Sequence, residues 1–168
     1  ILLTKDSTIS VSNGATLSLS GAITTLSSGS VGLTQDYYSA NYFADNLTFF
    51  SSNTVTSTSV VTSISGLNDY SQAKADYYSY RWTGYFRPTQ TGTYTLQTSS
   101  DDSSLVYVGV AGGLITDYIS TLQASSTIAG KATLVVSNSG THPPSTRNGS
   151  LSVTSGYSYP IVIYFGEN

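Results

Sequence analysis

Cysteine and methionine are both absent from this chain of 168 residues, and charged residues are scarce. Without cysteine the chain can form neither a disulfide framework nor a thiolate metal site. Charged residues make up 9% of the sequence, against about 25% in an average soluble domain. The six Lys and Arg residues are scattered and the net charge is −3. Because phosphate recognition needs clustered basic residues, this excludes a nucleic-acid-binding surface. The apolar runs are too short to cross a bilayer, so we expect no membrane insertion.

The residues that are abundant favour strands. Thr, Tyr and Val suit a pleated, half-buried surface, and Gly, Pro, Asn and Ser cluster between short alternating segments. This pattern is typical of an all-β, antiparallel β-sandwich. No segment has a convincing helical period, apart from one possible turn at residues 73–75. Asn13-Gly14 predicts a two-residue turn in an additional N-terminal β-hairpin. Segments with strand character lie at 33–38, 54–64, 78–87, 93–98, 104–108, 131–136, 150–154 and 160–165.

The strand predicted over residues 78–87 places its aromatic side chains on one face, as a period of two requires. These residues are Tyr78, Tyr80, Trp82 and Phe86. We expect Trp82 to anchor the core, because it shares that face with the other rings. Arg81 and Arg87 fall on the other face, where we expect solvated side chains. The strand at 160–165 is apolar on both faces, which indicates a covered, central strand.

A Ser- and Gly-rich stretch at residues 22–32 indicates a boundary. We predict an N-terminal β extension or stalk-like segment over residues 1–30 and a β-sandwich over residues 31–168. The chain starts at Ile1 without a charged n-region, so the sequence shows no signal peptide. We therefore expect it to be part of a larger surface protein or assembly.

Two adjacent carboxylates, Asp101 and Asp102, follow one of the predicted strands in a chain that is otherwise poor in charge. Asp residues beside Ser commonly satisfy a turn, because their side chains bond to nearby backbone groups. The alternative is a bound ion, since calcium prefers carboxylate and carbonyl oxygens.

Three ordered segments of the chain resemble the PA-fourteen domain, the β-sandwich of anthrax protective antigen that yeast flocculins, GLEYA adhesins and bacterial adhesins share. They are Trp82-Thr83-Gly84-Tyr85-Phe86, Thr91-Gly92-Thr93-Tyr94-Thr95 and Ser100-Asp101-Asp102-Ser103-Ser104-Leu105. Residues 32–38 resemble the opening strand of the family, and residues 157–164 resemble its late strand with the sequence Tyr-Pro-Ile. The resemblance covers residues 31–168 and leaves residues 1–30 outside it.

This resemblance implies a calcium-dependent, carbohydrate-binding domain. In the lectin members the two adjacent Asp residues are joined by a cis peptide bond and hold one Ca²⁺, which here implies metal- and sugar-binding roles for Asp101 and Asp102. With a trans bond their side chains would point to opposite faces of the strand. The third ligand of the family is an Asn after the late strand. Glu167 lies nearer to that position and Asn168 follows it, so both are candidate metal ligands.

The chain also departs from the family. The sugar-selecting residues and closing strands that follow the third ligand in the family are missing from it. We expect either that residues 1–30 supply replacement strands or that the domain is incomplete at its C-terminal end.

Enzymatic activity is not expected. His142 is the only His and cannot form a His-based zinc site without further ligands. No nucleophile-elbow motif surrounds any Ser. Glycosidase carboxyls stand about 5–10 Å apart, and Asp101 and Asp102 are too close together. Two glycosylation sequons, at residues 46–48 and 148–150, would matter only in a glycosylating secretory pathway. Chance is enough to explain both in a chain so rich in Ser and Thr.

Two functions follow from these observations. The first is a calcium-dependent, adhesin- or lectin-type domain that binds cell-surface or extracellular glycans through vicinal hydroxyls and a bound ion, on a cell or virion surface. The second is a non-lectin structural or assembly domain of a capsid, fibre or cell-wall protein. The Asp pair favours the first, while the shortened ligand loop and the stalk-like N-terminal segment favour the second.

Overall fold

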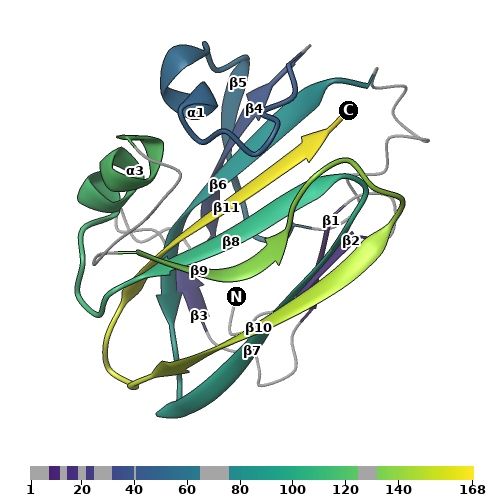
Figure 1. Cartoon of the computed structure of the whole chain (residues 1–168). Helices are drawn as coiled ribbons and strands as arrows, with labels where there is room; N and C mark the ends of the chain where they lie inside the picture. Colours follow the sequence, from purple (N-terminus) through teal and green to yellow (C-terminus); the bar gives the residue numbers. More distant parts are fainter. Residues whose placement is uncertain are drawn as a thin grey trace.

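The computed structural model describes residues 32–39, 41–64, 76–124 and 132–168, together with the backbone of three short strands within residues 8–24. The described residues form a β-sandwich of antiparallel strands with two helices (Figure 1). This confirms the all-β sandwich expected from the sequence. The turn expected at residues 73–75 lies outside the described residues.

Seven strands form the larger sheet, and four form the smaller one. The larger sheet has the order β5 (Ser57–Val61), β4 (Leu33–Tyr38), β6 (Tyr78–Arg87), β11 (Tyr159–Glu167), β8 (Ser103–Gly109) and β9 (Ala132–Asn138), with β3 (Ala22–Thr24) paired to β6. The smaller sheet has the order β1 (Thr8–Val11), β2 (Ala15–Ser18), β7 (Gly92–Ser100) and β10 (Ser145–Val153).

The N-terminal hairpin is confirmed, and its strands join the sandwich. β1 pairs with β2, and Val11 lies opposite Ala15. The two-residue turn predicted at Asn13-Gly14 lies outside the described residues. β2 continues the smaller sheet beside β7, whereas β3 pairs with β6 in the larger sheet. The first 30 residues therefore add strands to both sheets.

The main core lies between the two sheets and contains the aromatic face expected on β6. Trp82 and Phe86 are fully buried there, and Tyr94 and Leu96 of β7 pack from the opposite sheet. The Trp82 indole N–H donates to Gln35 Oε1 at 2.8 Å, which satisfies its one polar atom. Trp82 is thus a core anchor, as the strand pattern predicted.

β11 is the central strand that its two apolar faces indicated. It pairs with β6 on one side and β8 on the other. Alternate residues of β11 contribute to different cores: Ile161, Ile163 and Phe165 to the main core, Val162 and Tyr164 to a second cluster on the outer face of the larger sheet.

Two helices cover this outer face, and the expectation of no helix was wrong. α1 (Phe49–Ser52) is one turn, and α3 (Ile115–Ala124) is a helix of ten residues. Tyr118 and Leu122 of α3 are buried, and Ile115 and Ile119 pack against the same cluster. This spacing of three and four residues is helical, but strand signals on both sides hid it. Neither helix has the length and apolar content needed to cross a membrane.

Arg81 is not the solvated side chain that the sequence suggested. Its guanidinium donates to Asp36 Oδ2 from Nη2 at 2.6 Å and from Nε at 3.1 Å. Thr58 Oγ1 donates to the other oxygen of Asp36 at 2.6 Å, and Asp36 is buried. The ion pair therefore joins β4, β5 and β6. Arg87 is exposed, as expected, and donates to Ser158 Oγ at 2.9 Å.

The strand bounds agree closely with the expected segments, with two exceptions. β5 is shorter than the segment predicted at 54–64, and β10 is longer than the segment predicted at 150–154. β10 is held by nine paired residues of β7 rather than by its own apolar content. Gly149 allows it to approach β9, since a Cβ at this position would collide with the carbonyl oxygen of Val135.

We expect Gly149→Ala to lower the free energy of unfolding by about 3 kcal/mol, the upper part of the range for overpacked sites, because the obstacle is backbone and cannot rotate away. Ser150→Ala, an exposed change on the same strand, should stay within about 0.5 kcal/mol of wild type. Urea unfolding of the three proteins measures both values. Equal stability of Gly149→Ala and wild type would contradict the close approach of β9 and β10.

Candidate metal and ligand site

The two Asp residues form the turn between β7 and β8. Ser100 ends β7 and Ser103 begins β8, so Asp101 and Asp102 are the only residues between these strands. The peptide bond that joins them is cis, as the family resemblance implied. Asp102 is 3% exposed, and Asp101 is half-buried.

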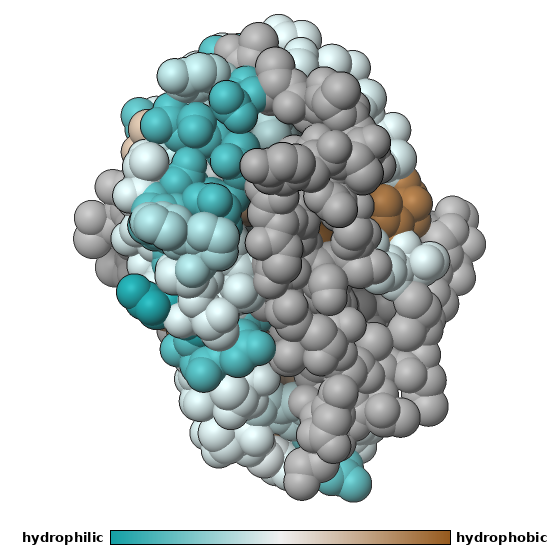
Figure 2. All heavy atoms as spheres, turned by 90° about the vertical axis from the view of Figure 1, so that its right-hand side faces the viewer, coloured by the Kyte–Doolittle hydropathy of each residue, from teal (hydrophilic) through white to brown (hydrophobic). Residues whose placement is uncertain are grey.

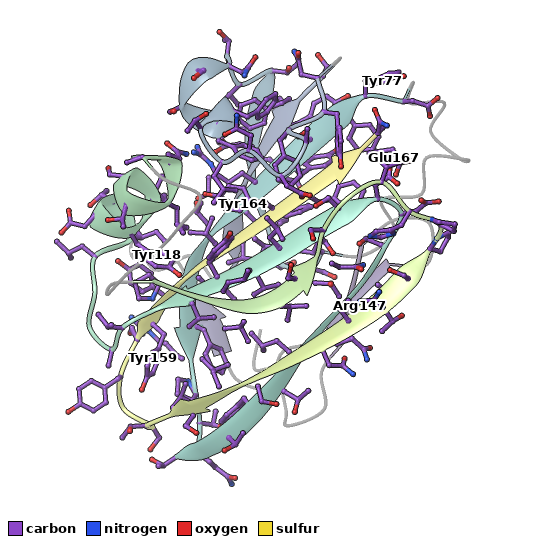
Figure 3. The ribbon with its side chains drawn as sticks, in the orientation of Figure 1. Tyr77, Tyr118, Arg147, Tyr159, Tyr164 and Glu167 are labelled. Atoms are coloured by element: carbon purple, nitrogen blue, oxygen red, sulfur yellow. The ribbon has the colours of Figure 1, made fainter. Side chains whose placement is uncertain are left out.

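A third carboxylate, Glu167, joins this pair. One carboxylate oxygen from each of Asp101, Asp102 and Glu167 lies within 4.8 Å of the other two. Glu167 is the last residue of β11, and the register of β11 against β8 places Gly166 opposite Ser103. Figure 3 shows Glu167 at the C-terminal end of this strand. The pairing of β11 with β8 therefore brings the end of the chain to the Asp turn.

Asp102 connects three segments of the chain. Its Oδ1 accepts a hydrogen bond from the backbone N–H of His142 at 2.7 Å. Its Oδ2 accepts from the backbone N–H of Asn168 at 3.0 Å. The side chain of Asn168 is exposed, and its Nδ2 donates to Thr141 Oγ1 at 3.4 Å. The structure thus brings all four predicted site residues together, and Asn168 contacts Asp102 through its backbone.

The loop over residues 139–144 is a part of the site that the sequence did not reveal. From the sequence, His142 was considered only as a zinc ligand, yet its backbone N–H donates to Asp102. Under the turn, Asn138 Nδ2 donates to Ser100 Oγ at 2.8 Å and to the Ser145 carbonyl at 2.9 Å, while Ser145 Oγ donates back to Asn138 Oδ1 at 2.7 Å. This buried network fixes the loop against the Asp turn.

Asp45 is the second residue that sequence reasoning missed. Its Oδ1 accepts from Ser103 Oγ, and its Oδ2 accepts from the Gly140 backbone N–H at 2.8 Å. Its φ of 58° is in the left-handed region, which Asp tolerates better than most residues. Asp45 therefore ties the Asp turn to the loop at 139–144. No local pattern marks this role, since Gly140 is 95 residues away in the sequence.

The segment that carries Asp45 is held over the end of β11. Ser79 Oγ on β6 accepts from the Phe43 N–H and donates to the Asn41 carbonyl, both at 3.0 Å. A Cβ at Gly166 would lie 2.6 Å from a ring carbon of Phe43 and 2.7 Å from one of Tyr42. Glycine at position 166 thus lets both rings cross the strand beside the carboxylates.

The electrostatics of the cluster are those of crowded carboxylates. Burial raises the pKa of Asp101, and the negative charge of Asp102 raises it further, while the nearby His142 opposes the rise. Burial also raises the pKa of Tyr42, with a hydrogen bond to Thr141 acting against it. An arrangement of three carboxylates that share so little space could hold a metal ion, and hard ions such as Ca²⁺ prefer oxygen ligands.

The surroundings of the cluster are polar. Figure 2 shows the side of the molecule that lies on the right in Figure 1, where the C-terminus of the chain lies, and the described residues on it are mostly hydrophilic. Next to the cluster, Thr141 and Asn168 are exposed, and Tyr42 and His142 are half-buried. These side chains offer hydrogen-bond donors and acceptors to a hydroxylated ligand.

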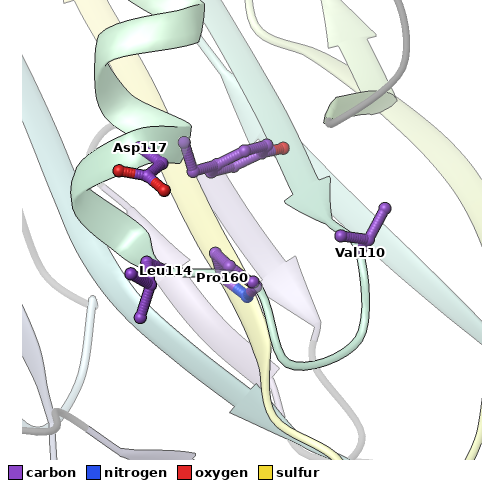
Figure 4. Close-up of a pocket in the computed structure, with 6 residues that line it drawn as sticks. Val110, Leu114, Asp117 and Pro160 are labelled. Carbon is purple, nitrogen blue, oxygen red and sulfur yellow. The ribbon is translucent and has the colours of Figure 1, made fainter.

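A separate cavity lies near the start of β11, away from the carboxylates. Its volume is about 90 Å³, and Figure 4 shows it between α3 and Pro160. Asp117 is the one charged group in the lining, and Tyr118 carries the one other polar side chain. This cavity lacks the convergent polar groups that fix a hydroxylated ligand. Its lining consists of Val110, Gly113, Leu114, Asp117, Tyr118 and Pro160.

The comparison of the sequence with protein families decides the relationship. The PA14 (PA-fourteen) domain family matches residues 29–168. The chain belongs to the PA14 domain family. No curated protein matches it by sequence. The family match confirms the resemblance carried by the segments around Trp82, Tyr94 and Asp101.

Solved structures with a similar fold include two A domains of epithelial adhesins from Candida glabrata, each 14% identical to this PA14 domain with a TM-score of 0.56. The match to epithelial adhesin 6, solved with Galβ1-3GlcNAc, covers 88% of this chain and 80% of the adhesin chain. For epithelial adhesin 9, solved with Galβ1-4GlcNAc, the shares are 98% and 83%.

A β-glucosidase from Kluyveromyces marxianus is 13% identical, with a TM-score of 0.56 over 86% of this chain and 16% of the enzyme. At these identities the likeness to all three structures establishes the fold.

We expect Asp101→Asn to raise the melting temperature of the metal-free PA14 domain by about 1–3 °C at neutral pH. The raised pKa of Asp101 means that the folded state disfavours its ionised form. Stability of wild type should therefore rise as the pH falls through this raised pKa towards 3.8, the ordinary value, and the variant should lack that component.

Asp102→Asn is the matched comparison and should lower the melting temperature, because one of the two backbone N–H groups loses its acceptor. Thermal unfolding in excess chelator across the acidic pH range measures both variants. An unchanged or lower melting temperature for Asp101→Asn would contradict the cost of ionising Asp101, which comes from its burial and from the nearby charge of Asp102.

Asp45→Ala should lower the free energy of unfolding by about 1–3 kcal/mol, since alanine leaves the Ser103 hydroxyl and the Gly140 N–H without their acceptor. Hydrogen exchange at the Gly140 amide should accelerate, because this N–H loses its partner. Asp76→Asn, an exposed change, is the control and should alter neither value. Unchanged protection of Gly140 would show that Asp45 does not hold the loop.

Proposed function

We propose that this PA14 domain is a calcium-dependent, lectin-type module of an extracellular or cell-surface protein that binds glycans. The observation that carries the proposal is the cluster of three carboxylates that Asp101, Asp102 and Glu167 form at the end of the central strand. Membership of the PA14 family supports it. Similar folds are seen in two adhesin domains solved with galactose-containing disaccharides, which indicates glycans as partners.

The carboxylates of Asp101 and Asp102 would hold the ion, with Glu167 and the side-chain oxygen of Asn168 as secondary ligands. A bound Ca²⁺ supplies coordination positions for two neighbouring sugar hydroxyls, because calcium takes six to eight oxygen ligands. The chain itself orients the acids: His142 and Asn168 donate to Asp102 and hold the turn in place. Thr141 and Tyr42 would then contact the sugar at the edge of the site.

The proposed module is not itself a catalyst. A retaining glycosidase needs two carboxyls about 5 Å apart and an inverting one needs about 6.5–9.5 Å, so that a sugar or a water fits between them. One carboxylate oxygen from each of Asp101, Asp102 and Glu167 lies within 4.8 Å of the other two, a spacing that suits ligands of one ion. Asp102 is also occupied by two backbone N–H donors, which leaves it poorly placed to transfer a proton.

A second function is favoured by one observation. β5 forms an edge of the larger sheet, its five residues carry no charge, and its Val60 is 56% exposed. Uncharged edge strands are ready to pair with a strand of another chain. The alternative function is therefore a structural or assembly domain of a capsid, fibre or cell-wall protein, without lectin activity.

Calcium should raise the melting temperature of the wild-type domain, with a stabilisation of about 2.7 kcal/mol when the ion is present at 100 times its dissociation constant. Asp102→Ala should abolish the rise, and Asp76→Asn should preserve it.

Binding of galactose-containing glycans, measured by calorimetry with and without excess chelator, should require calcium. A single sugar should bind near 1 mM, about 4 kcal/mol.

Each outcome separates the candidate functions. Glycan binding that persists in excess chelator would overturn the calcium mechanism while retaining the lectin. Calcium binding without affinity for any glycan, together with a dimer or larger species in solution, would favour the assembly domain. Absence of a calcium response in both wild type and Asp102→Ala would exclude the metal site.

A further inference from the structure

The turn that follows Asp45 carries a modification motif that the proposed site does not use. Asn46-Leu47-Thr48 has the acceptor pattern for N-linked glycosylation. Asn46 is exposed, whereas Leu47 is fully buried in the cluster on the outer face of the larger sheet. The buried Leu47 fixes the turn to the protein and leaves the side chain of Asn46 at the surface, where a glycan can be accommodated.

The hydrogen bonds within this motif prepare the amide of Asn46. Its Oδ1 accepts from Thr48 Oγ1 at 2.8 Å and from the Thr48 backbone N–H at 3.1 Å. Two donors on the amide oxygen stabilise negative charge there, which eases the loss of a proton from Nδ2 as the nitrogen forms a new bond. Among the described residues, Nδ2 has no hydrogen-bond partner, so a sugar attached to it displaces no contact.

The second motif, Asn148-Gly149-Ser150, has the same pattern but a different geometry. It lies within β10, where Asn148 Oδ1 accepts from Gln97 Nε2 at 2.8 Å. The hydroxyl of Ser150 pairs with Thr95 Oγ1 at 3.4 Å and not with Asn148. Both polar groups are therefore engaged by β7, and the hydroxyl cannot act on the amide two residues before it.

The contacts that fix the conformation of the two motifs also differ in their separation along the sequence. The turn at Asn46 closes within three residues, so it can form before the sheets assemble. The extended conformation of Asn148 is set by pairing with a strand about 50 residues earlier. We propose that Asn46 is an N-glycosylation site of this protein and that Asn148 is at most a minor one.

The reaction takes its sugar from a lipid diphosphate-linked oligosaccharide. Asn46 Nδ2 forms a bond to C1 of the first sugar, and the bond from C1 to the diphosphate oxygen breaks with its electron pair on the departing lipid diphosphate. One Nδ2 proton passes to a base of the transferring enzyme. The hydrogen bonds to Oδ1 persist in the product, because the amide oxygen is not consumed.

The test is secretion of the 168-residue chain from a eukaryotic cell, followed by mass spectrometry of the peptides that carry Asn46 and Asn148 after enzymatic removal of the glycans. Asn46 should be occupied at least about fivefold more often than Asn148, the factor expected from one hydrogen bond of ordinary net strength. Asn46→Gln should remove the major glycan, and Asn148→Gln should leave it in place.

Ser150→Thr is the matched control for residue type, since it gives both motifs a threonine. Asn148 should remain the poorer acceptor in this variant. Equal occupancy of the two positions after the change would show that threonine, and not the turn, explains the difference, and would overturn the geometric argument. Thermal unfolding of the secreted wild-type protein checks that it is folded. If Asn46 is unmodified in this folded protein, the proposal itself is overturned.

Discussion

The position of β11 between β6 and β8 is the constraint on which the rest of this structure depends. β11 is buried on both faces, and its pairing with both neighbours fixes where its last residue stands. One register step in an antiparallel pair would turn every side chain to the opposite face, which the two apolar cores forbid. The same packing that holds the sandwich together therefore delivers Glu167 and Asn168 to the Asp turn.

The chain has few charged residues, and several of them lie in two clusters in the larger sheet and at the end of β11. Asp36 is paired with Arg81 inside the larger sheet, and the acids near the end of β11 meet at one place. Hydroxyl and amide side chains, rather than salt bridges, make most of the polar contacts between these segments. Ser79 and Asn138 bond to segments that are far away in the sequence, and Ser145 bonds to Asn138 across one loop, through short, largely buried hydrogen bonds. Such bonds are directional, so they fix the loops against one another as well as satisfying buried polar groups.

The comparison between sequence and structure shows where local patterns suffice. The bounds of β4 and β6 agree with the expected segments, because alternation of aromatic and polar residues is visible along them. α3 was missed although Ile115, Tyr118, Ile119 and Leu122 have helical spacing, since its neighbours are strands. β10 was underestimated because it has few apolar residues and depends on β7 for its conformation. The Asp pair and Glu167 were named as candidate ligands, but Asp45 and the loop around His142, which contact this cluster, were not.

By itself, the sequence determined the class of fold, the face of β6 that enters the core, the central place of β11 and the adjacency of the two Asp residues. These follow from periodicity and covalent order, which are local properties. The family resemblance named Glu167 and Asn168 as candidate ligands beside the Asp pair. Only the tertiary structure decided which atoms of these residues and of His142 meet Asp102, and that Asp45 ties Ser103 to Gly140. The physical reason is that hydrogen bonds between distant loops depend on strand register and on the approach of the two sheets, and neither leaves a signal in any short stretch of residues.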